Sequence, residues 1–357
     1  MYYFEESAKN YDTSRIFNFN FTDPDLNFNE RFVTAKNQAY AAYAQATYSP
    51  DSLDRRLHIT VGARYSHDKR QGSYQRNITQ ASGAQIIGPF GEGTLKSHDF
   101  SPSLTLAYEV TPRINVYGKV VKGYKTGGFN VNASSLEKFI DGFGPEDVIS
   151  YEVGFKSELF DRTLRFNAAA FWMDYKDIQV GVADPVNPIL VDIINAGKSR
   201  IRGLEVDLTA YPAPGLTLAV NYGYLDAKFT KVLNANDVDI SGSFPFVQAP
   251  EHTLSASADY EIAQTTVGTL SANVSYSYVD KQFSQTGDAS YIIPSYGLLD
   301  ARLTLAEIPF LDNELKMSLW GKNLTDKEYY INHGNFFVPG AQFGSPRSYG
   351  VDLTFDF

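Results

Sequence analysis

The amino-acid sequence predicts an all-β protein, the antiparallel wall of a transmembrane β-barrel with about fourteen strands. Three observations support this fold class. Segments of about ten residues alternate apolar and polar side chains, as strands with two different faces do. The connections between these segments are short and long in turn. Tyr and Phe are abundant, 24 and 25 residues, and gather toward segment ends, where a membrane girdle belongs.

The C-terminal segment, residues 347–357, shows the alternation most clearly. Successive side chains of an extended strand point to opposite faces, so one face here is apolar and the other carries Ser, Gly, Asp and Thr. A tilted strand of about ten residues is long enough to cross a bilayer. The apolar face consists of Tyr349, Val351, Leu353, Phe355 and Phe357.

Earlier segments repeat this pattern, at 100–110, 216–224, 252–260 and 270–278. A backbone in hydrocarbon leaves no donor unpaired, so the strands are expected to form a closed barrel. If strands are missing, the wall is either open at Met1–Phe4 or closed on a smaller radius, and both alternatives remain. The residues expected to face lipid are Leu104, Leu106, Leu218, Val220, Ala256, Val274, Leu303, Leu353 and Phe355.

Short and long connections alternate along the chain from about Gln38 onward. Transmembrane barrels have this parity, because short turns join strands on the periplasmic side and long loops join them outside. Before Gln38, residues 2–4 are interpreted as the end of a strand and residues 5–37 as polar and irregular. The expected short connections are 49–56, 110–113, 160–162, 211–215, 262–266 and 307–313, and the long ones lie near 70–97, 124–146, 181–200, 229–250, 284–295 and 323–346.

Composition excludes several function classes. The chain has 357 residues, no cysteine and a net charge of −10, which argues against thiolate metal sites and against nucleic acid as a partner. Its five histidines lack the spacing of a metal site, and neither a GxSxG elbow nor a P-loop is present. No apolar run approaches the length of a membrane helix. We therefore expect no enzyme, no metal site and no cofactor.

Five stretches resemble landmarks of the TonB-dependent outer-membrane receptor family. Residues 123–130, GYKTGGFN, look like its glycine-rich signature, and residues 151–161 resemble its next strand and turn. Three further matches are 202–207 (RGLEVD), 323–329 (NLTDKEY) and 344–347 (GSPR), which precede the terminal strand. The residues carried over as family signature are Gly123, Gly127, Gly128, Phe129, Asn323, Pro346 and Arg347.

The resemblance covers about Gln38 to Phe357 and implies a place in the bacterial outer membrane. Receptors of this family have a barrel of about 22 strands with an N-terminal plug inside it. Neither plug nor TonB box is visible, and residues 1–6 lack the features of a signal peptide. Residues 1–357 are therefore expected to be the C-terminal barrel part of such a receptor, or the product of a truncated gene, with the plug and first strands absent.

The resemblance implies active uptake of a ferric siderophore or a similar scarce ligand. The partners it implies are outer-membrane lipid and lipopolysaccharide, the TonB complex, the barrel-assembly machinery and a small ligand, expected to be a metal chelate. The alternatives are a passive porin and a non-functional truncated receptor. An outer-membrane hydrolase would need a Ser/His/acid constellation at the rim, which the sequence does not reveal.

Loop 323–346 is the expected ligand surface, although half of its aromatics could instead belong to the membrane girdle. The glycines of the signature are interpreted as a hinge with positive φ, with direct ligand contact as the alternative. The terminal strand with Phe357 is expected to be the membrane-insertion signal, and a simple girdle residue is the alternative. The candidate ligand residues are Tyr329, Tyr330, His333, Phe336 and Phe337. Charged residues expected on the lumen face are Glu152, Lys156, Glu205, Asp207, Asp300 and Arg302.

Overall fold

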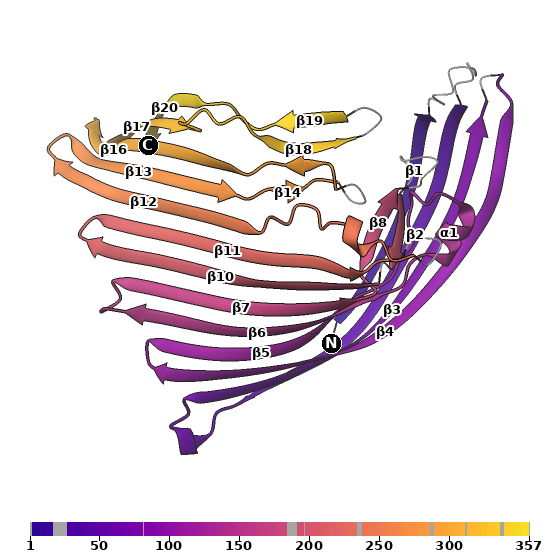
Figure 1. The fold of residues 1–357 in the computed structure, drawn as a ribbon, viewed down its shortest axis with the longest axis horizontal. Helices are drawn as coiled ribbons and strands as arrows, with labels where there is room; N and C mark the ends of the chain where they lie inside the picture. The colour runs from indigo at the N-terminus through magenta and orange to yellow at the C-terminus, as the bar shows by residue number, and fades with distance from the viewer. Residues whose placement is uncertain are drawn as a thin grey trace.

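The protein is one curved antiparallel sheet of fourteen strands, neighbouring each other in chain order (Figure 1). The structure, a computed structural model, describes residues 2–16, 27–80, 82–183, 191–195, 197–233, 238–285, 289–310, 313–335 and 339–356. The sheet strands are β1 (Tyr2–Ile16), β2 (Asn27–Tyr48), β3 (Leu57–Thr79), β4 (Gln85–Thr111), β5 (Ile114–Lys125), β6 (Glu146–Leu159), β7 (Leu164–Lys176), β10 (Lys198–Ala213), β11 (Leu216–Lys231), β12 (His252–Thr265), β13 (Gly268–Val279), β16 (Tyr296–Phe310), β17 (Asn313–Lys322) and β20 (Ser348–Asp356).

The expected strand number and orientation are confirmed, because every ladder of this sheet is antiparallel and joins consecutive sheet strands. An isolated parallel bridge, Val247–Phe283, lies outside the sheet, among the loops. The strand order starts at β1 and ends at β20 with no ladder between these two strands. Of the two alternatives, the open wall is therefore the one observed.

Short turns lie at one end of the sheet and longer excursions at the other (Figure 1). The turn end holds the expected short connections, of which 307–313 includes residues 311 and 312, outside the described residues. The other end, here called the loop end, carries three small hairpins and a helix. These are β8–β9 (Gln179–Ala183, Val191–Asn195), β14–β15 (Gln282–Phe283, Ile292–Ile293), β18–β19 (Tyr330–Asn335, Pro339–Phe343) and α1 (Leu136–Asp141).

Two expectations about the N-terminal part are wrong. Residues 70–97 are no long loop, since β3 and β4 stay paired from Leu57–Tyr108 to Thr79–Gln85, with one register shift between Gln75 and Asn77. Likewise, residues 5–37 are largely strand, because β1 and β2 pair from Tyr2–Ala41 to Ile16–Asn27. The polar, glycine-containing composition of these stretches suggested loops. Beyond the lipid both faces of a strand can be polar, so alternation fades while backbone pairing continues.

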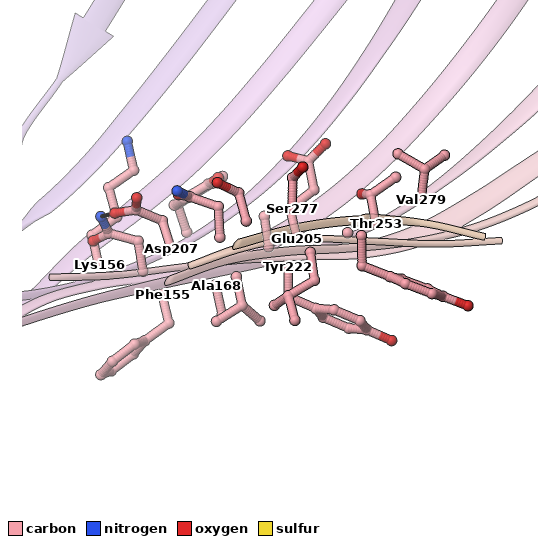
Figure 2. Close-up of a pocket in the computed structure, with 18 residues that line it drawn as sticks. Phe155, Lys156, Ala168, Glu205, Asp207, Tyr222, Thr253, Ser277 and Val279 are labelled. Atoms are coloured by element: carbon pink, nitrogen blue, oxygen red, sulfur yellow. Dashed lines mark hydrogen bonds between the residues drawn. The ribbon is translucent and has the colours of Figure 1, made fainter. Parts of the chain in front are cut away.

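The two faces of the sheet differ in polarity as expected. In one cross-strand row the apolar Phe155, Ala168, Val206 and Tyr222 lie side by side. Figure 2 shows Phe155, Ala168 and Tyr222 on one side of the sheet, and Lys156, Glu205 and Asp207 on the concave side. The apolar convex face is therefore the outer face.

The residues expected to face lipid all belong to this outer face by register. Many are exposed, among them Leu106 (44%), Val274 (45%) and Leu353 (67%). Exposed apolar area on this scale would be unfavourable in water and is favourable in a bilayer.

Candidate functional site

The concave face is a wall of compensated charges. Lys119 and the Tyr117 hydroxyl contact the Glu152 carboxylate at 2.9 and 2.7 Å. Asn167 donates to Asp207 at 3.1 Å. Further along, Arg302 and the Trp320 indole donate to Asp352 at 2.8 and 3.0 Å, and Asp300 accepts the Asn323 N–H. The hollow in Figure 2, about 510 Å³, is lined from both faces of the sheet, so it defines no ligand pocket.

The glycines of the 123–130 signature allow close packing rather than positive φ. Gly128 and Phe143 form a bridge with N–H···O bonds of 3.0 and 2.9 Å in both directions. A Cβ on Gly127 would lie 2.1 Å from the Phe143 carbonyl oxygen, and one on Gly123 would lie 2.7 Å from Val148 Cγ1. None of the three glycines has positive φ. The hinge interpretation is therefore wrong, and the signature closes its own loop backbone.

Phe129 anchors this loop in a cradle of glycines on the concave face of β3 and β4. A Cβ on Gly93 would lie 2.4 Å from the Phe129 ring, and one on Gly72 would lie 2.9 Å from it. Phe139 of α1 is fully buried beside Phe129 and Tyr74, with ring centroids 5.3 and 5.0 Å away. The sequence signal for this docking was the i, i+3, i+4 spacing of Leu136, Phe139 and Ile140, opposite Gly91 and Gly93.

A carboxylate that the sequence analysis missed ties the signature loop to the β8–β9 hairpin. Asp192 of β9 is 7% exposed and accepts the backbone N–H and hydroxyl of Ser134, both at 2.8 Å, and it is ion-paired with Lys138. Burial alone raises the pKa of Asp192, but Lys138 and both Ser134 donors outweigh it and hold the pKa below its ordinary value. The tie is built from loop residues far apart in sequence, so no local pattern predicted it.

The structure brings two of the five candidate ligand residues, Tyr330 and His333, into one aromatic cluster at the loop end. Tyr330 lies between His333 and Phe343, with ring centroids 5.8 and 4.9 Å away. His333 also contacts Tyr291 of the neighbouring loop at 5.2 Å. Tyr329 stacks on Tyr296 at 4.5 Å, while Phe336 and Phe337 lie outside the described residues.

The hollow beside this cluster is small. It has about 140 Å³ and is lined by Tyr329, Tyr330 and Phe343 among others. Pockets that enclose a small molecule usually have about 300–1,000 Å³. A ligand would therefore lie across the cluster instead of inside it.

The remaining signature residues lie in one hydrogen-bonded turn, called here the Asn323 turn. Asn323 is 4% exposed with φ of 49°, and its side chain donates to Lys327 O (2.9 Å) and Ser345 O (3.2 Å) and accepts the Lys327 N–H (2.8 Å). Arg347 forms an ion pair with Asp326 at 3.1 Å, and Pro346 lies along the chain between the Asn323 turn and β20. Asn tolerates this left-handed conformation better than most residues, which explains its place at this turn.

The terminal strand has the expected apolar face. Exposures are 66% for Tyr349, 58% for Val351, 67% for Leu353 and 37% for Phe355, while Phe357 lies outside the described residues. Among the described residues β20 pairs only with β17, so its other edge is open.

The described part of the chain offers little for catalysis or metal binding. Ser49 Oγ lies 2.8 Å from His58 Nδ1, and His58 Nε2 lies 3.1 Å from Glu109 Oε1, at the turn end. This is the Ser/His/acid contact that the sequence did not reveal. None of Ser49, His58 and Glu109 lines the hollow in Figure 2 or the one beside the aromatic cluster. In the same residues no His/Asp/Glu cluster has metal-binding geometry, and no helix has the length and apolar character needed to cross a membrane.

Comparison with known proteins gives a consistent family. Residues 2–324 match the model for the TonB dependent receptor-like β-barrel. The pesticin receptor of Yersinia pestis is 29% identical over 326 residues, 90% of this chain and 44% of that protein. The metal-pseudopaline receptor CntO of Pseudomonas aeruginosa is 27% identical over 258 residues, 72% of this chain and 33% of that protein. The chain thus spans less than half the length of these curated relatives.

Solved structures share the fold. The ferric yersiniabactin uptake receptor FyuA from Yersinia pestis superposes with a TM-score of 0.73 at 24% identity, over 93% of this chain and 47% of that one. The ferric citrate transporter FecA gives 0.60 at 15% identity, over 99% and 58%. With the family model matching residues 2–324, the chain belongs to the TonB-dependent receptors of the outer membrane, and it forms part of their β-barrel.

Proposed function

We propose that this chain is the wall of an outer-membrane receptor that takes up a metal chelate of the siderophore class, and that its loop end contacts the chelate. The observation that carries the proposal is the pairing of a polar concave wall with an aromatic cluster at the loop end. Tyr329, Tyr330 and His333 would supply flat faces and polar edges to a chelate lying across them.

The relatives support this substrate class. One is named as a receptor for metal-pseudopaline, and a solved structural neighbour takes up ferric yersiniabactin. The fastened signature loop also suits the proposal. Its glycine bridge and the Asp192 tie hold the loop end in one shape, which lowers the entropy cost of binding.

The proposal includes three protein or lipid partners. The TonB complex would supply the work of uptake through a region outside residues 1–357. The barrel-assembly machinery would read the terminal strand, with Phe357 at its end, and lipopolysaccharide would surround the outer leaflet part of the wall. The plug expected inside the family's barrels would face the compensated charges of the concave wall.

The test uses the complete 357-residue chain refolded in detergent. Ferric hydroxamate, catecholate and carboxylate chelates are titrated while quenching of Tyr and Trp fluorescence is followed. One class should quench saturably, and Tyr330→Ala with His333→Ala should weaken its binding about tenfold or more, roughly 1.4 kcal/mol. Tyr211→Ala is the matched control, because Tyr211 is exposed at the opposite end of the sheet.

Three outcomes would contradict the proposal. Saturable quenching that survives the double substitution unchanged would remove the aromatic cluster from the ligand site. Liposomes containing the chain that swell in sugars of increasing size, without any response to the chelates, would favour the passive pore instead. A chain that neither quenches nor conducts would match the truncated, inactive alternative.

A further inference from the structure

Two histidines lie directly opposite each other on the outer face of β3 and β4, strands that run side by side in Figure 1. The ladder pairs His67 with His98, and both positions share the parity of Leu104 and Leu106 on the outer face. Directly opposed residues of an antiparallel pair have Cβ atoms about 4.5–5.5 Å apart. The sheet therefore fixes two imidazole side chains at adjacent places on one surface. His67 and His98 are called here the outer histidine pair.

The outer histidine pair is the first polar row beyond the apolar band. Toward the turn end, the neighbouring outward pair is Tyr65 and Phe100, with exposures of 51% and 57%. Toward the loop end, the neighbouring outward pair is Lys69 and Lys96. Aromatic residues mark the interface between membrane and water. The two histidines therefore lie at the edge of the lipid, where water and dissolved ions reach them.

Neither member of the pair has another partner. The other three histidines of the chain each have a hydrogen-bond partner. Within the described residues, His67 and His98 have no hydrogen bond, ion pair or ring contact, and both are exposed. Their rings can turn toward a common ion without breaking any of these contacts. The cost is limited to the rotamer freedom of two short side chains.

The spacing of the pair suits one transition-metal ion. Zn–N bonds of about 2.0–2.1 Å at a tetrahedral angle place two donor nitrogens about 3.3 Å apart. This distance is shorter than the usual separation of opposed Cβ atoms, so the two rings need only converge. Two imidazoles fill two of the four positions, and water keeps the others. Such a site exchanges its ion, unlike the clusters of three or more ligands, of which the described residues contain none.

Donor type and local charge select the kind of ion. Imidazole nitrogen binds Cu²⁺, Ni²⁺ and Zn²⁺, whereas Ca²⁺ and Mg²⁺ prefer oxygen ligands. The register neighbours of the pair are Tyr40, Lys69 and Lys96, and none of them is a carboxylate. The two lysines repel any divalent ion, although water and salt screen the repulsion. The pair therefore favours ions that bond strongly to nitrogen and discriminates against Ca²⁺ and Mg²⁺.

We propose that the outer histidine pair binds one exchangeable divalent transition-metal ion, with Cu²⁺ held more tightly than Zn²⁺. Each histidine binds as neutral imidazole, through a lone pair on one ring nitrogen. The ion then links β3 to β4 at the edge of the lipid. The positions of the histidines along the chain did not indicate this site, because only the strand register brings them together. The inference requires neither the chelate nor the TonB complex.

The test titrates the complete chain, without an affinity tag and in detergent, with Cu²⁺ and with Zn²⁺ as simple chlorides. One ion per chain should bind, and Ca²⁺ should not compete. His67→Gln and His98→Gln should each weaken binding about tenfold or more, because a single imidazole loses the advantage of two linked donors. His252→Gln is the matched control, since His252 lies on β12 and should leave the affinity unchanged.

Bound Cu²⁺ supplies a second measurement. Electron paramagnetic resonance should show coupling to two imidazole nitrogens in the unaltered chain and to one in either single variant. Because the ion links two strands, it should also slow amide hydrogen exchange on both sides of the pair. A loss of binding that came only from misfolding would not change the number of coupled nitrogens from two to one.

Three results would overturn the proposal. Two equal weak sites, one of them lost in each single variant, would show that the histidines bind ions separately. An affinity unchanged in both variants would place the ion elsewhere on the chain. Competition by Ca²⁺ would indicate carboxylate ligands. Each of these results leaves the chelate titration at Tyr330 and His333 unaffected, so the two proposals fail separately.

Discussion

Replacing Phe139 by Ala should release the signature loop from the wall without unfolding the sheet. Phe139 is fully buried in a cluster whose other buried members are Val33, Tyr74 and Ala133. Truncating a buried Phe typically costs about 3–5 kcal/mol. The six-residue helix α1 has little stability by itself, because helix nucleation is costly. The loss should therefore exceed what keeps α1 docked. The fourteen-strand sheet contributes Val33 and Tyr74 to this cluster but is held together by its own antiparallel ladders.

Hydrogen exchange at four amides reports this release. Phe139 N–H donates to Ser135 O at 3.1 Å, and Gly142 N–H donates to Lys138 O at 3.2 Å. The Gly128 and Phe143 amides form the bridge that closes the loop. A loss of about 3 kcal/mol corresponds to protection lower by about 100-fold or more at these sites.

Phe160→Ala is the matched control, because Phe160 is 75% exposed at a short turn. It removes the same atoms and should leave all four amides unchanged. If Phe139→Ala leaves them protected in a folded barrel, packing against β3 and β4 does not hold the loop. The reasoning from burial would then be refuted.

Four further outcomes are expected. Val274→Arg on the outer face should lower barrel stability by about 2–4 kcal/mol, measured from heat-modifiable gel mobility. Ser275→Arg on the concave face should lower it little, and equal losses would contradict the assignment of faces. Asn323→Gly keeps the left-handed backbone but loses the side-chain hydrogen bonds, so thermal unfolding should show a free energy of unfolding lower by about 1–3 kcal/mol. No change would mean that the Asn323 turn does not contribute to stability. The pKa of Asp192 is depressed in the folded chain, so its contacts with Ser134 and Lys138 are present above the ordinary carboxyl pKa and are lost as the pH falls through the folded value. Amide hydrogen exchange in β8–β9 should therefore rise at acid pH. This rise should be absent in Asp192→Asn. Removing Phe357 should reduce the outer-membrane-inserted fraction relative to periplasmic aggregate; unchanged insertion would leave it a girdle residue.

The sequence by itself determined the fold class, the strand number and the lipid-facing residues. Side-chain alternation has a period of two, so Val274 and Leu353 could be assigned to a face without any tertiary information. Turn chemistry likewise located the short connections, since residues such as Pro112 and Gly215 act locally. The family signature was also readable, although its glycines were given the wrong physical role.

Tertiary structure decided everything that depends on contacts between distant segments. The paired extension of β3 and β4 through residues 70–97 arises because backbone hydrogen bonds pair strands whatever their side chains, once neither face meets lipid. The cradle of Gly72 and Gly93 becomes visible only when Phe129 fills it, and the Asp192 tie joins loops that no periodicity relates. The open edges of β1 and β20 are a property of the whole sheet, because closure depends on strand number, tilt and shear together.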